Sequence, residues 1–235
     1  MKMTVIIPTY NEGENLRLLT ESILQLGLDF RILIVDDNSP DGTGRIADDM
    51  AAAIPAIGVL HRPGREGYGR ALTAGFRHVL AHEPEVEALL SMDADFSHQP
   101  RYLPVFAQAL IDHDVVIGSR YVRGGGVANW GLHRRLLSRG GNLYTRCITG
   151  LAIRDCTSGF AAYRRRVLES LKFEDLGAQG YSFLIELKFL IAQSGASVKE
   201  IPITFIERQR GTSKMHLGIA AEALLLAWKL RAKRR

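Results

Sequence analysis

Apolar residues recur at two different spacings along the first half of the chain. Short apolar runs predict buried strands, and longer segments with an apolar residue every three or four positions predict amphipathic helices. The predicted strands are residues 4–7, 31–35, 57–60, 88–92 and 115–118, and the predicted helices are residues 14–26, 44–53, 68–80 and 100–110. Short strands that alternate with helices favour an α/β fold, in which a mainly parallel sheet carries helices on both faces.

The second half of the chain, after Tyr121, has a different pattern. A glycine-rich break at Gly124–Gly126 leads into a basic helical stretch from His133 to Ile148. The elements predicted after it are a helix over residues 183–193, a strand over 198–205, a loop over 207–214 and a last amphipathic helix. Because no linker separates the halves, we predict one domain. It comprises residues 1–235, divided into 1–121, 122–216 and a C-terminal amphipathic basic helix over 217–235.

The composition agrees with a globular domain, because 46% of the 235 residues are hydrophobic and 23% are charged. The formal net charge of +5 favours acidic partners such as nucleotides, phosphates or anionic lipid, without distinguishing among them. Cys147 and Cys156 have neither the spacing of a metal site nor that of a disulfide framework. Two isolated thiols fit a reduced, cytoplasmic compartment.

No segment predicts a helix that crosses a membrane. The apolar run Val5–Ile7 is too short for a signal peptide, and the late apolar stretch over residues 217–230 is interrupted by Glu222 and Lys229. A membrane-spanning helix needs about 20 mainly apolar residues. We therefore expect the protein to lie on a membrane surface rather than to cross it.

Polar clusters follow four of the predicted strands. They are residues 8–12, 36–43, 93–95 and 118–121. In a parallel sheet the carboxyl ends of the strands meet at one edge, and ligands bind beyond that edge. Four clusters at one edge predict a ligand site much more strongly than any single cluster does.

Asp93 and Asp95 are two residues apart at the end of a predicted strand. Their carboxylates can turn toward one hard divalent cation and leave coordination positions open for phosphate oxygens. Such a cation neutralises a diphosphate and stabilises it as a leaving group. The alternative is a solvated turn or a helix cap before Pro100, which is the commoner meaning of an isolated pair. The position at the sheet edge favours the metal site.

The acidic loop over residues 36–43 also matches the opening of an EF-hand calcium loop, with Asp37 and Asp41 among the matching positions. An EF-hand needs a helix on each side, but the preceding segment is rich in β-branched residues. Gly44 also stands where an apolar residue belongs. We therefore reject calcium and predict a turn in which Asp37 accepts hydrogen bonds from the edge of a nucleobase.

Signatures of other nucleotide- or nucleic-acid-binding proteins are missing from the sequence. A Rossmann dehydrogenase needs GxGxxG directly after the first strand, where this chain has residues 8–12. The phosphate-loop pattern GxxxxGK[ST] does not occur. A nucleic-acid partner is not expected either, because only the basic charge favours one, without a recognition helix or a stacking platform.

The motifs resemble those of the inverting glycosyltransferases of family 2, which have the GT-A fold, a Rossmann-like sheet with helices on both faces. The widely shared motifs are residues 5–12, residues 35–43 and Asp93-Ala94-Asp95. Later segments narrow the resemblance to the dolichol-phosphate (polyprenol-phosphate) mannosyltransferases, along nearly the whole chain. These segments are residues 118–121, Trp130-Gly131 with the basic helix, residues 138–142, residues 157–160, and Arg208 with residues 211–214.

The resemblance implies a role for each matching position. The residues that would line a guanosine pocket are Pro8, Tyr10, Glu12, Val35 and Asp37. Those that would hold Mg²⁺ or Mn²⁺ and the diphosphate are Asp93, Ala94 and Asp95. Those that would contact the phosphates and the sugar are Arg120, Arg208 and Lys214. Those that would face the acceptor phosphate are Arg134 and Ser138, so that residues 1–121 form a nucleotide-sugar half and residues 122–216 an acceptor half.

The implied reaction transfers mannose from GDP-mannose to a polyprenyl (dolichyl-type) monophosphate and inverts the sugar to a β-linked product. The catalytic residues would be Asp95, Arg120, Arg134 and Ser138. A phosphate acceptor is already anionic at neutral pH, so the reaction needs cations that bring two phosphates together more than it needs a general base. Arg134 and Ser138 are four residues apart, so one face of a helix carries both.

Several alternatives stay open. The same fold can use another donor or acceptor, for example UDP-glucose, or serve as a non-catalytic nucleotide- or lipid-binding module. The basic stretch Arg134–Arg146 can be a solvated face or a surface for anionic lipid. Residues 217–235 can bind the cytoplasmic face of a membrane, with roughly 1 kcal/mol from each basic residue. Otherwise a separate membrane-anchoring subunit is needed, or these residues are simply the last helix of the domain.

Overall fold

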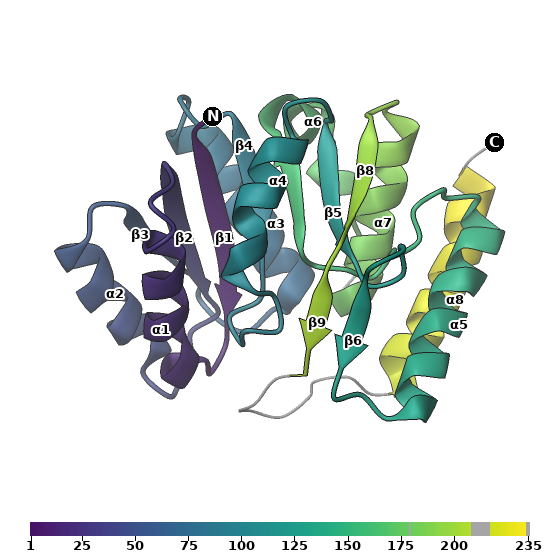
Figure 1. Cartoon of the computed structure of the whole chain (residues 1–235), viewed down its shortest axis with the longest axis horizontal. Coiled ribbons are helices and arrows are strands. Elements are labelled where there is room, and N and C mark those ends of the chain that lie inside the picture. Colours follow the sequence, from purple (N-terminus) through teal and green to yellow (C-terminus); the bar gives the residue numbers. More distant parts are fainter. Residues whose placement is uncertain (179, 208–216, 234–235) are drawn as a thin grey trace.

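The computed structural model describes residues 1–178, 180–207 and 217–233. Its centre is a seven-stranded sheet in the order β3-β2-β1-β4-β7-β5-β8 (Figure 1). The strands are β1 (Met3–Thr9), β2 (Phe30–Asp36), β3 (Ile57–His61), β4 (Ala88–Ser91), β5 (Val115–Ser119), β7 (Ala161–Arg164) and β8 (Val198–Pro202). Neighbouring strands are parallel except for the two pairs that include β7. The predicted mainly parallel sheet is confirmed.

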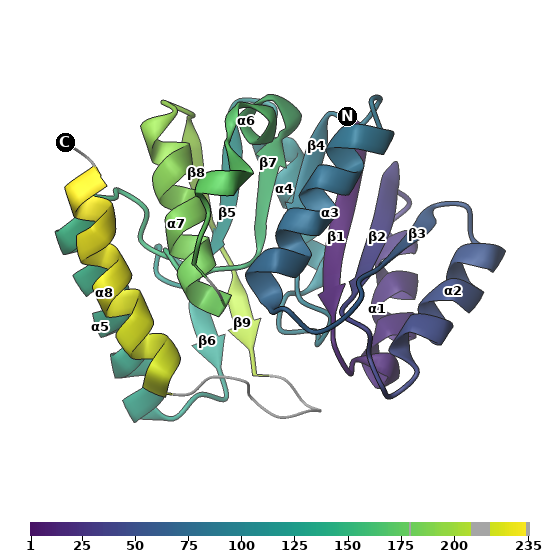
Figure 2. The same ribbon diagram turned by 180° about the vertical axis from the view of Figure 1, so that it is seen from behind.

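Helices cover both faces of the sheet (Figures 1 and 2). One face carries α1 (Gly13–Leu24), α2 (Thr43–Ala53) and α4 (Leu103–Ala109), which follows a 3₁₀ turn over Pro100–Tyr102. The other face carries α3 (Tyr68–His82), α6 (Arg165–Ser170) and α7 (Gly180–Gln193), with a 3₁₀ turn over Phe173–Asp175. Because side chains of a strand alternate between the faces, Ile6 packs in one core, and Val5 and Ile7 pack in the other.

The antiparallel strand β7 explains why the polar clusters share an edge. β7 pairs with β4 on one side and with β5 on the other, antiparallel in both cases. Two strands that are antiparallel to the same neighbour run in the same direction, so β4 and β5 end at the edge where β1 and β2 end. The sequence did not predict β7, since its buried positions Ala161 and Ala162 give a weak apolar signal.

The strand predicted over residues 198–205 is wrong in one respect, because the chain leaves the large sheet within it. β8 ends at Pro202, which has no backbone N–H to continue the ladder. Ile203 then bridges two sheets: its N–H donates to the Ser119 carbonyl (3.1 Å), and its carbonyl accepts from Gly126 (2.9 Å). β9 (Thr204–Ile206) pairs with β6 (Gly126–Ala128) in a separate parallel pair. The predicted glycine-rich break therefore leads directly into a strand.

The last helix, α8 (Leu217–Lys233), packs beside α5 (Leu132–Thr149) and also against α7. Leu226 and Leu230 of α8 are buried in the core that α3 and α7 share. The helix therefore closes the domain, while its outer side chains stay exposed. In the part of the chain that the structure describes, no helix has both the length and the apolar character that crossing a bilayer requires.

Close packing of α3 on β1 gives a test of the fold. A Cβ at Gly75 would lie 2.6 Å from Cγ2 of Ile6, whereas a Cβ at Gly140 of α5 would meet nothing within 4 Å. We expect Gly75→Ala to lower the free energy of unfolding by about 1–3 kcal/mol through overpacking. Gly140→Ala should raise it by about 0.5–1 kcal/mol, since alanine favours a helix. Urea denaturation measures both, and an unchanged Gly75→Ala protein would contradict this packing.

Candidate active site

Hydrogen bonds to two carboxylates, those of Asp36 and Asp41, shape the region after β1 and β2. The Thr9 hydroxyl donates to Asp36 (3.0 Å), which also accepts from the N–H (3.0 Å) and the hydroxyl (2.6 Å) of Ser39. Asp41 accepts from the N–H (3.0 Å) and the hydroxyl (2.6 Å) of Thr43, at the start of α2. Burial alone would raise the pKa of Asp41, but these hydrogen bonds lower it below its usual value. The carboxylates of this acidic loop therefore shape a turn.

Asp37, the predicted acceptor for a nucleobase, is buried and holds the loop after β3. Its carboxylate pairs with Arg62 and accepts from the N–H groups of Glu66 and the following glycine, both at 3.3 Å. The guanidinium of Arg65, in the same loop, lies 4.5 Å from the centre of the Tyr10 ring. Asp37 thus fixes the loop that borders Tyr10. Its contact with a base stays a prediction.

The other predicted nucleoside residues lie at the same edge. Pro8 and Val35 are opposite each other in the paired strands β1 and β2. Glu12 is the first residue before α1, and its N–H donates to the Thr43 hydroxyl (3.0 Å). The residues predicted to surround a nucleoside therefore come from adjacent strand ends and the helix that follows β1.

The acidic turn Asp93-Ala94-Asp95 follows β4. Asp93 has a quarter of its side chain exposed (25%), and Asp95 is buried with an Oδ1 that accepts from the Ser97 N–H (3.0 Å). The Asp93 N–H donates to Nδ1 of His98 (2.9 Å). Burial lowers the pKa of His98, although both carboxylates act in the opposite direction. A neutral His98 accepts through Nδ1, so its proton is on Nε2.

Arg120, at the end of β5, is held by Asp155. Its backbone N–H (2.9 Å) and Nε (2.8 Å) donate to Oδ2 of Asp155, and its Nη2 donates to Oδ1 (2.7 Å). Both side chains are buried. Burial alone would raise the pKa of Asp155, but Arg120 and the nearby Lys188 bring it below its usual value. The structure thus fixes the guanidinium, and its predicted contact with substrate phosphates stays a proposal.

Lys188 of α7 is a buried cation behind this ion pair. Its Nζ donates to the backbone carbonyls of Cys156 (3.0 Å) and Ser158 (2.6 Å). Ser158 in turn donates its hydroxyl to the carbonyl of Gly118 in β5 (2.6 Å). Burial lowers the pKa of Lys188 to about 8, against the opposing effect of Asp155. The ammonium therefore anchors the segment that carries Asp155 to the end of β5.

Arg134 and Ser138, the predicted acceptor residues, lie in α5 and contact the same region. The Tyr121 hydroxyl donates to the Ser138 hydroxyl (2.6 Å). Asn142, one turn further along α5, donates to the Ser138 carbonyl (2.9 Å) and accepts from the Cys156 N–H (2.7 Å). These contacts attach α5 to the Asp155 segment. The helix face with Arg134 and Ser138 is therefore fixed relative to Arg120.

A row of aromatic rings connects the acidic turn to Arg134. His98 meets the Phe205 ring edge-on at 5.7 Å, and Phe205 meets Trp130 at 5.5 Å. The Arg134 guanidinium lies 4.2 Å from the centre of the Trp130 ring, and the Arg120 guanidinium lies 5.5 Å from that of Phe205. Cations favour the faces of such rings. The carboxylates and the two arginines therefore flank one row of rings.

Residues 4–172 match the family profile described as Glycosyl transferase family 2. The chain belongs to this family. An undecaprenyl-phosphate mannosyltransferase from Micrococcus luteus is 43% identical over 235 residues, which cover 99% of this chain and 96% of that protein. The polyprenol monophosphomannose synthase of Mycolicibacterium smegmatis is 44% identical over 97% of this chain and 87% of that protein. The predicted resemblance to mannosyltransferases of polyprenol phosphates is confirmed.

Solved structures of glycosyltransferases share the fold. The glucosyl-3-phosphoglycerate synthase of Mycobacterium tuberculosis, in complex with Mn²⁺, UDP and glucosyl-3-phosphoglycerate, matches with a TM-score of 0.70 and 21% identity. The match covers 99% of this chain and 80% of that chain. At this identity the similarity concerns the fold alone. The predicted GT-A fold of this family 2 glycosyltransferase is confirmed.

Two predicted site residues, Arg208 and Lys214, lie outside the described residues. Three further residues of the site were not predicted from the sequence. Asp155 and Glu207 pair with the two arginines, and Lys188 binds the segment that carries Asp155. The sequence does contain an indication of Lys188, because this residue interrupts the apolar run of α7. Charged residues are rarely buried without a partner. No local sequence pattern indicates Asp155 or Glu207, since their roles come from contacts with distant parts of the chain.

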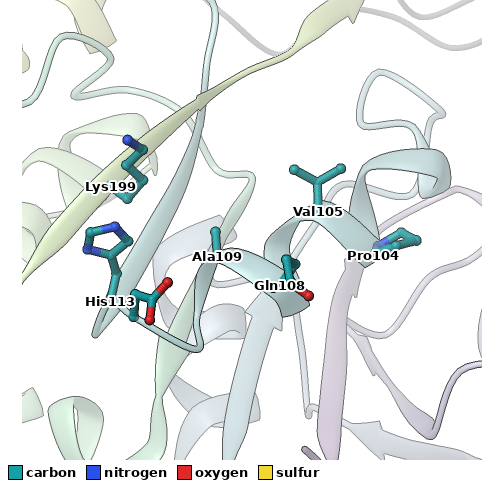
Figure 3. Close-up of a pocket in the computed structure, with 7 residues that line it drawn as sticks. Pro104, Val105, Gln108, Ala109, His113 and Lys199 are labelled. Carbon is teal, nitrogen blue, oxygen red and sulfur yellow. The ribbon is translucent and has the colours of Figure 1, made fainter.

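A separate pocket of about 480 Å³ lies beside α4 and β8 (Figure 3). The side chains around it are Pro104, Val105, Gln108, Ala109, Asp112, His113 and Lys199. None of the predicted site residues lines it. This pocket is therefore distinct from the strand-end site of the glycosyltransferase.

The buried Lys188 makes the stability depend on pH in a defined direction. Its pKa is about 8 in the folded protein, against an ordinary value of 10.5. Between these values the unfolded chain holds a proton that the folded protein has released, so this residue makes the free energy of unfolding rise with pH. We expect wild type to gain stability over Lys188→Met through this window, by at most about 1.4 kcal/mol per pH unit.

Urea denaturation of both proteins across this pH range measures the difference. The comparison cancels the titration of groups that both proteins contain. One such group is Cys156, because burial raises the pKa of its thiol to about 12. A difference that does not change with pH would contradict the lowered pKa of the buried Lys188.

Proposed function

We propose that this glycosyltransferase transfers mannose from GDP-mannose to a polyprenyl monophosphate and inverts the sugar. The observation that carries the proposal is the arrangement of charges: an acidic turn at one end of the aromatic row, and Arg134 with Ser138 at the other. The acidic turn suits the cation of a nucleotide diphosphate, and the basic helix face suits a second phosphate. Two relatives that match nearly the whole chain are named for mannosyl transfer to polyprenol phosphates, and they support the same function.

The acidic turn suits Mg²⁺ or Mn²⁺ held jointly with a substrate. No group of three or more His, Cys, Asp or Glu side chains in the described ranges could hold a metal without other ligands. Two carboxylates, Asp93 and Asp95, leave room for phosphate oxygens, as is usual for magnesium bound with a nucleotide. The buried Ser97 hydroxyl beside them makes no hydrogen bond with the described residues. A bound divalent ion would neutralise the diphosphate as a leaving group.

Side chains of the protein are proposed to bind the acceptor phosphate. Arg134 and Ser138 would hold its phosphate so that one oxygen faces the anomeric carbon of mannose. That oxygen forms the new bond as the bond to the diphosphate breaks, and attack from the opposite face inverts the sugar. The acceptor oxygen is already anionic, so none of these residues has to remove a proton. Arg120, Arg208 and Lys214 are proposed to neutralise the phosphates of the donor.

The lipid acceptor suggests that α5 and α8 lie on a membrane surface. Leu136 and Leu143 of α5 are seven residues apart on one helix face and are 61% and 59% exposed. On α8, Leu225 and Trp228 are 66% and 54% exposed. Exposed arginine and lysine residues stand among them, which favours an anionic surface. We propose peripheral binding through these two helices, alone or with an anchoring subunit.

A donor panel tests the proposed reaction. The purified protein is incubated with Mg²⁺ or Mn²⁺, a short polyprenyl phosphate and radiolabelled nucleotide sugars, and the label in the organic phase is counted. We expect label from GDP-mannose alone, lost on adding EDTA. Asp95→Asn should reduce transfer by about 100-fold or more, since it weakens the cation at the leaving group, with an unchanged circular dichroism spectrum.

Other outcomes of the panel have defined meanings. Label from UDP-glucose would correct the donor and keep the mechanism. Normal turnover by Asp95→Asn would remove the metal assignment. Binding of nucleotide without transfer to any acceptor would favour a binding module.

Co-sedimentation with phosphatidylglycerol vesicles tests the membrane surface. Leu225→Glu replaces an exposed apolar side chain of α8 by a charge that anionic lipid repels. We expect about tenfold weaker binding or more, given about 1.5–3 kcal/mol for burial of a leucine. Ile111→Glu is the matched control, because Ile111 is 59% exposed but lies in the turn between α4 and β5. Equal binding by wild type and Leu225→Glu would contradict this surface.

A further inference from the structure

Arg134 already has an anionic partner within the protein. Its Nη1 forms an ion pair with Oε1 of Glu207, which directly follows β9. The two side chains are 31% and 37% exposed, so solvent and solutes reach both. Exposed pairs of this kind contribute little net stability, because water screens them and ordering two long side chains costs entropy. A more highly charged anion can therefore open the pair.

Trp130 positions Arg134 independently of Glu207. The guanidinium carbon lies 4.2 Å from the centre of the Trp130 ring. Trp130 itself is only 7% exposed and packs against Phe205. This contact does not involve the carboxylate of Glu207, so Arg134 keeps its cation–π position when the ion pair opens. Glu207 is thus unnecessary for orienting Arg134, and its effect on a ligand of Arg134 is competition.

We infer that Glu207 competes with the acceptor phosphate for Arg134. The inference rests on the proposed function, since it takes Arg134 as a ligand of that phosphate. A guanidinium recognises carboxylates and phosphates by the same hydrogen-bond geometry, so either anion can occupy it. A phosphate monoester carries close to two negative charges at neutral pH, and a carboxylate carries one. The acceptor therefore displaces Glu207 at a modest cost in affinity.

The same competition acts on the product. Transfer of mannose converts the phosphate monoester into a diester, which keeps a single negative charge. Glu207 then faces a weaker rival for Arg134 and re-forms the ion pair as the lipid product leaves. Pairing with Glu207 reduces the affinity of acceptor and product by the same factor, because both need an unpaired Arg134. Pairing with Glu207 thus weakens binding of the acceptor and speeds release of the product.

Glu207→Gln tests the competition, because glutamine keeps the shape of the side chain and removes its charge. We expect the KM for a short, water-soluble isoprenyl phosphate to fall about two- to five-fold, the range of an exposed ion pair. The inhibition constant of the mannosylated product should fall by the same factor, and the KM for GDP-mannose should not change. A water-soluble acceptor keeps membrane binding out of the comparison.

Two further variants make the test specific. Glu174→Gln is the matched control, because it removes the same charge from the surface pair of Glu174 with Arg77. It should leave both KM values unchanged. Arg134→Ala should raise the KM for the acceptor, and adding Glu207→Gln to it should bring no gain, since the site of competition is gone.

The outcomes separate this inference from the proposed function. An acceptor KM that stays the same or rises in Glu207→Gln, while Arg134→Ala is defective, would overturn the competition alone. A gain from Glu207→Gln that persists in the Arg134→Ala background would overturn it as well, by placing the effect elsewhere. An Arg134→Ala protein with an unchanged acceptor KM would instead overturn the proposed acceptor site.

Discussion

The buried carboxylate of Asp155 lies where the end of β5 meets α5 and α7. It accepts three hydrogen bonds from Arg120, and the backbone N–H of Asp155 donates to Glu200 of β8 (3.0 Å). Removing one partner of such a buried pair costs about 3–5 kcal/mol, because the other charge stays buried without compensation. The end of β5, the segment after α5 and the buried Lys188 therefore have to assemble together. The positions of Arg120 and of the α5 face both depend on that assembly.

The acidic turn and Arg134 lie at opposite ends of the row formed by His98, Phe205 and Trp130. In the proposed function, Asp93 and Asp95 bind a cation, and Arg134 binds an anion. Phe205 and Trp130 lie between His98, which binds the N–H of Asp93, and Arg134. Aromatic faces tolerate a cation at their surface while they exclude water. In the proposed function, a nucleotide diphosphate and a lipid phosphate bind at the two ends of this row of rings.

The two arginines of the site differ in the depth of their ion pairs. Arg120 is 8% exposed and bound to Asp155 by several hydrogen bonds, so its pairing is part of the fold. Arg134 is 31% exposed and pairs with Glu207 through one nitrogen, so its pairing can exchange. Burial decides between these roles, because a charge that water reaches can leave its partner at little cost. The permanent pair thus positions the site, and the exchangeable pair can respond to a substrate.

The sequence alone determined the parallel strands, because strands buried on both faces contain continuous apolar runs such as residues 5–7. It also placed polar clusters at strand ends, and it put Arg134 and Ser138 on one helix face through their spacing. Only the tertiary structure decided the rest. β7 has few large apolar residues, and its direction is set by pairing with strands far away in the chain. Asp155 and Glu207 are 35 and 73 residues from the arginines they bind, a separation at which no local pattern specifies a partner.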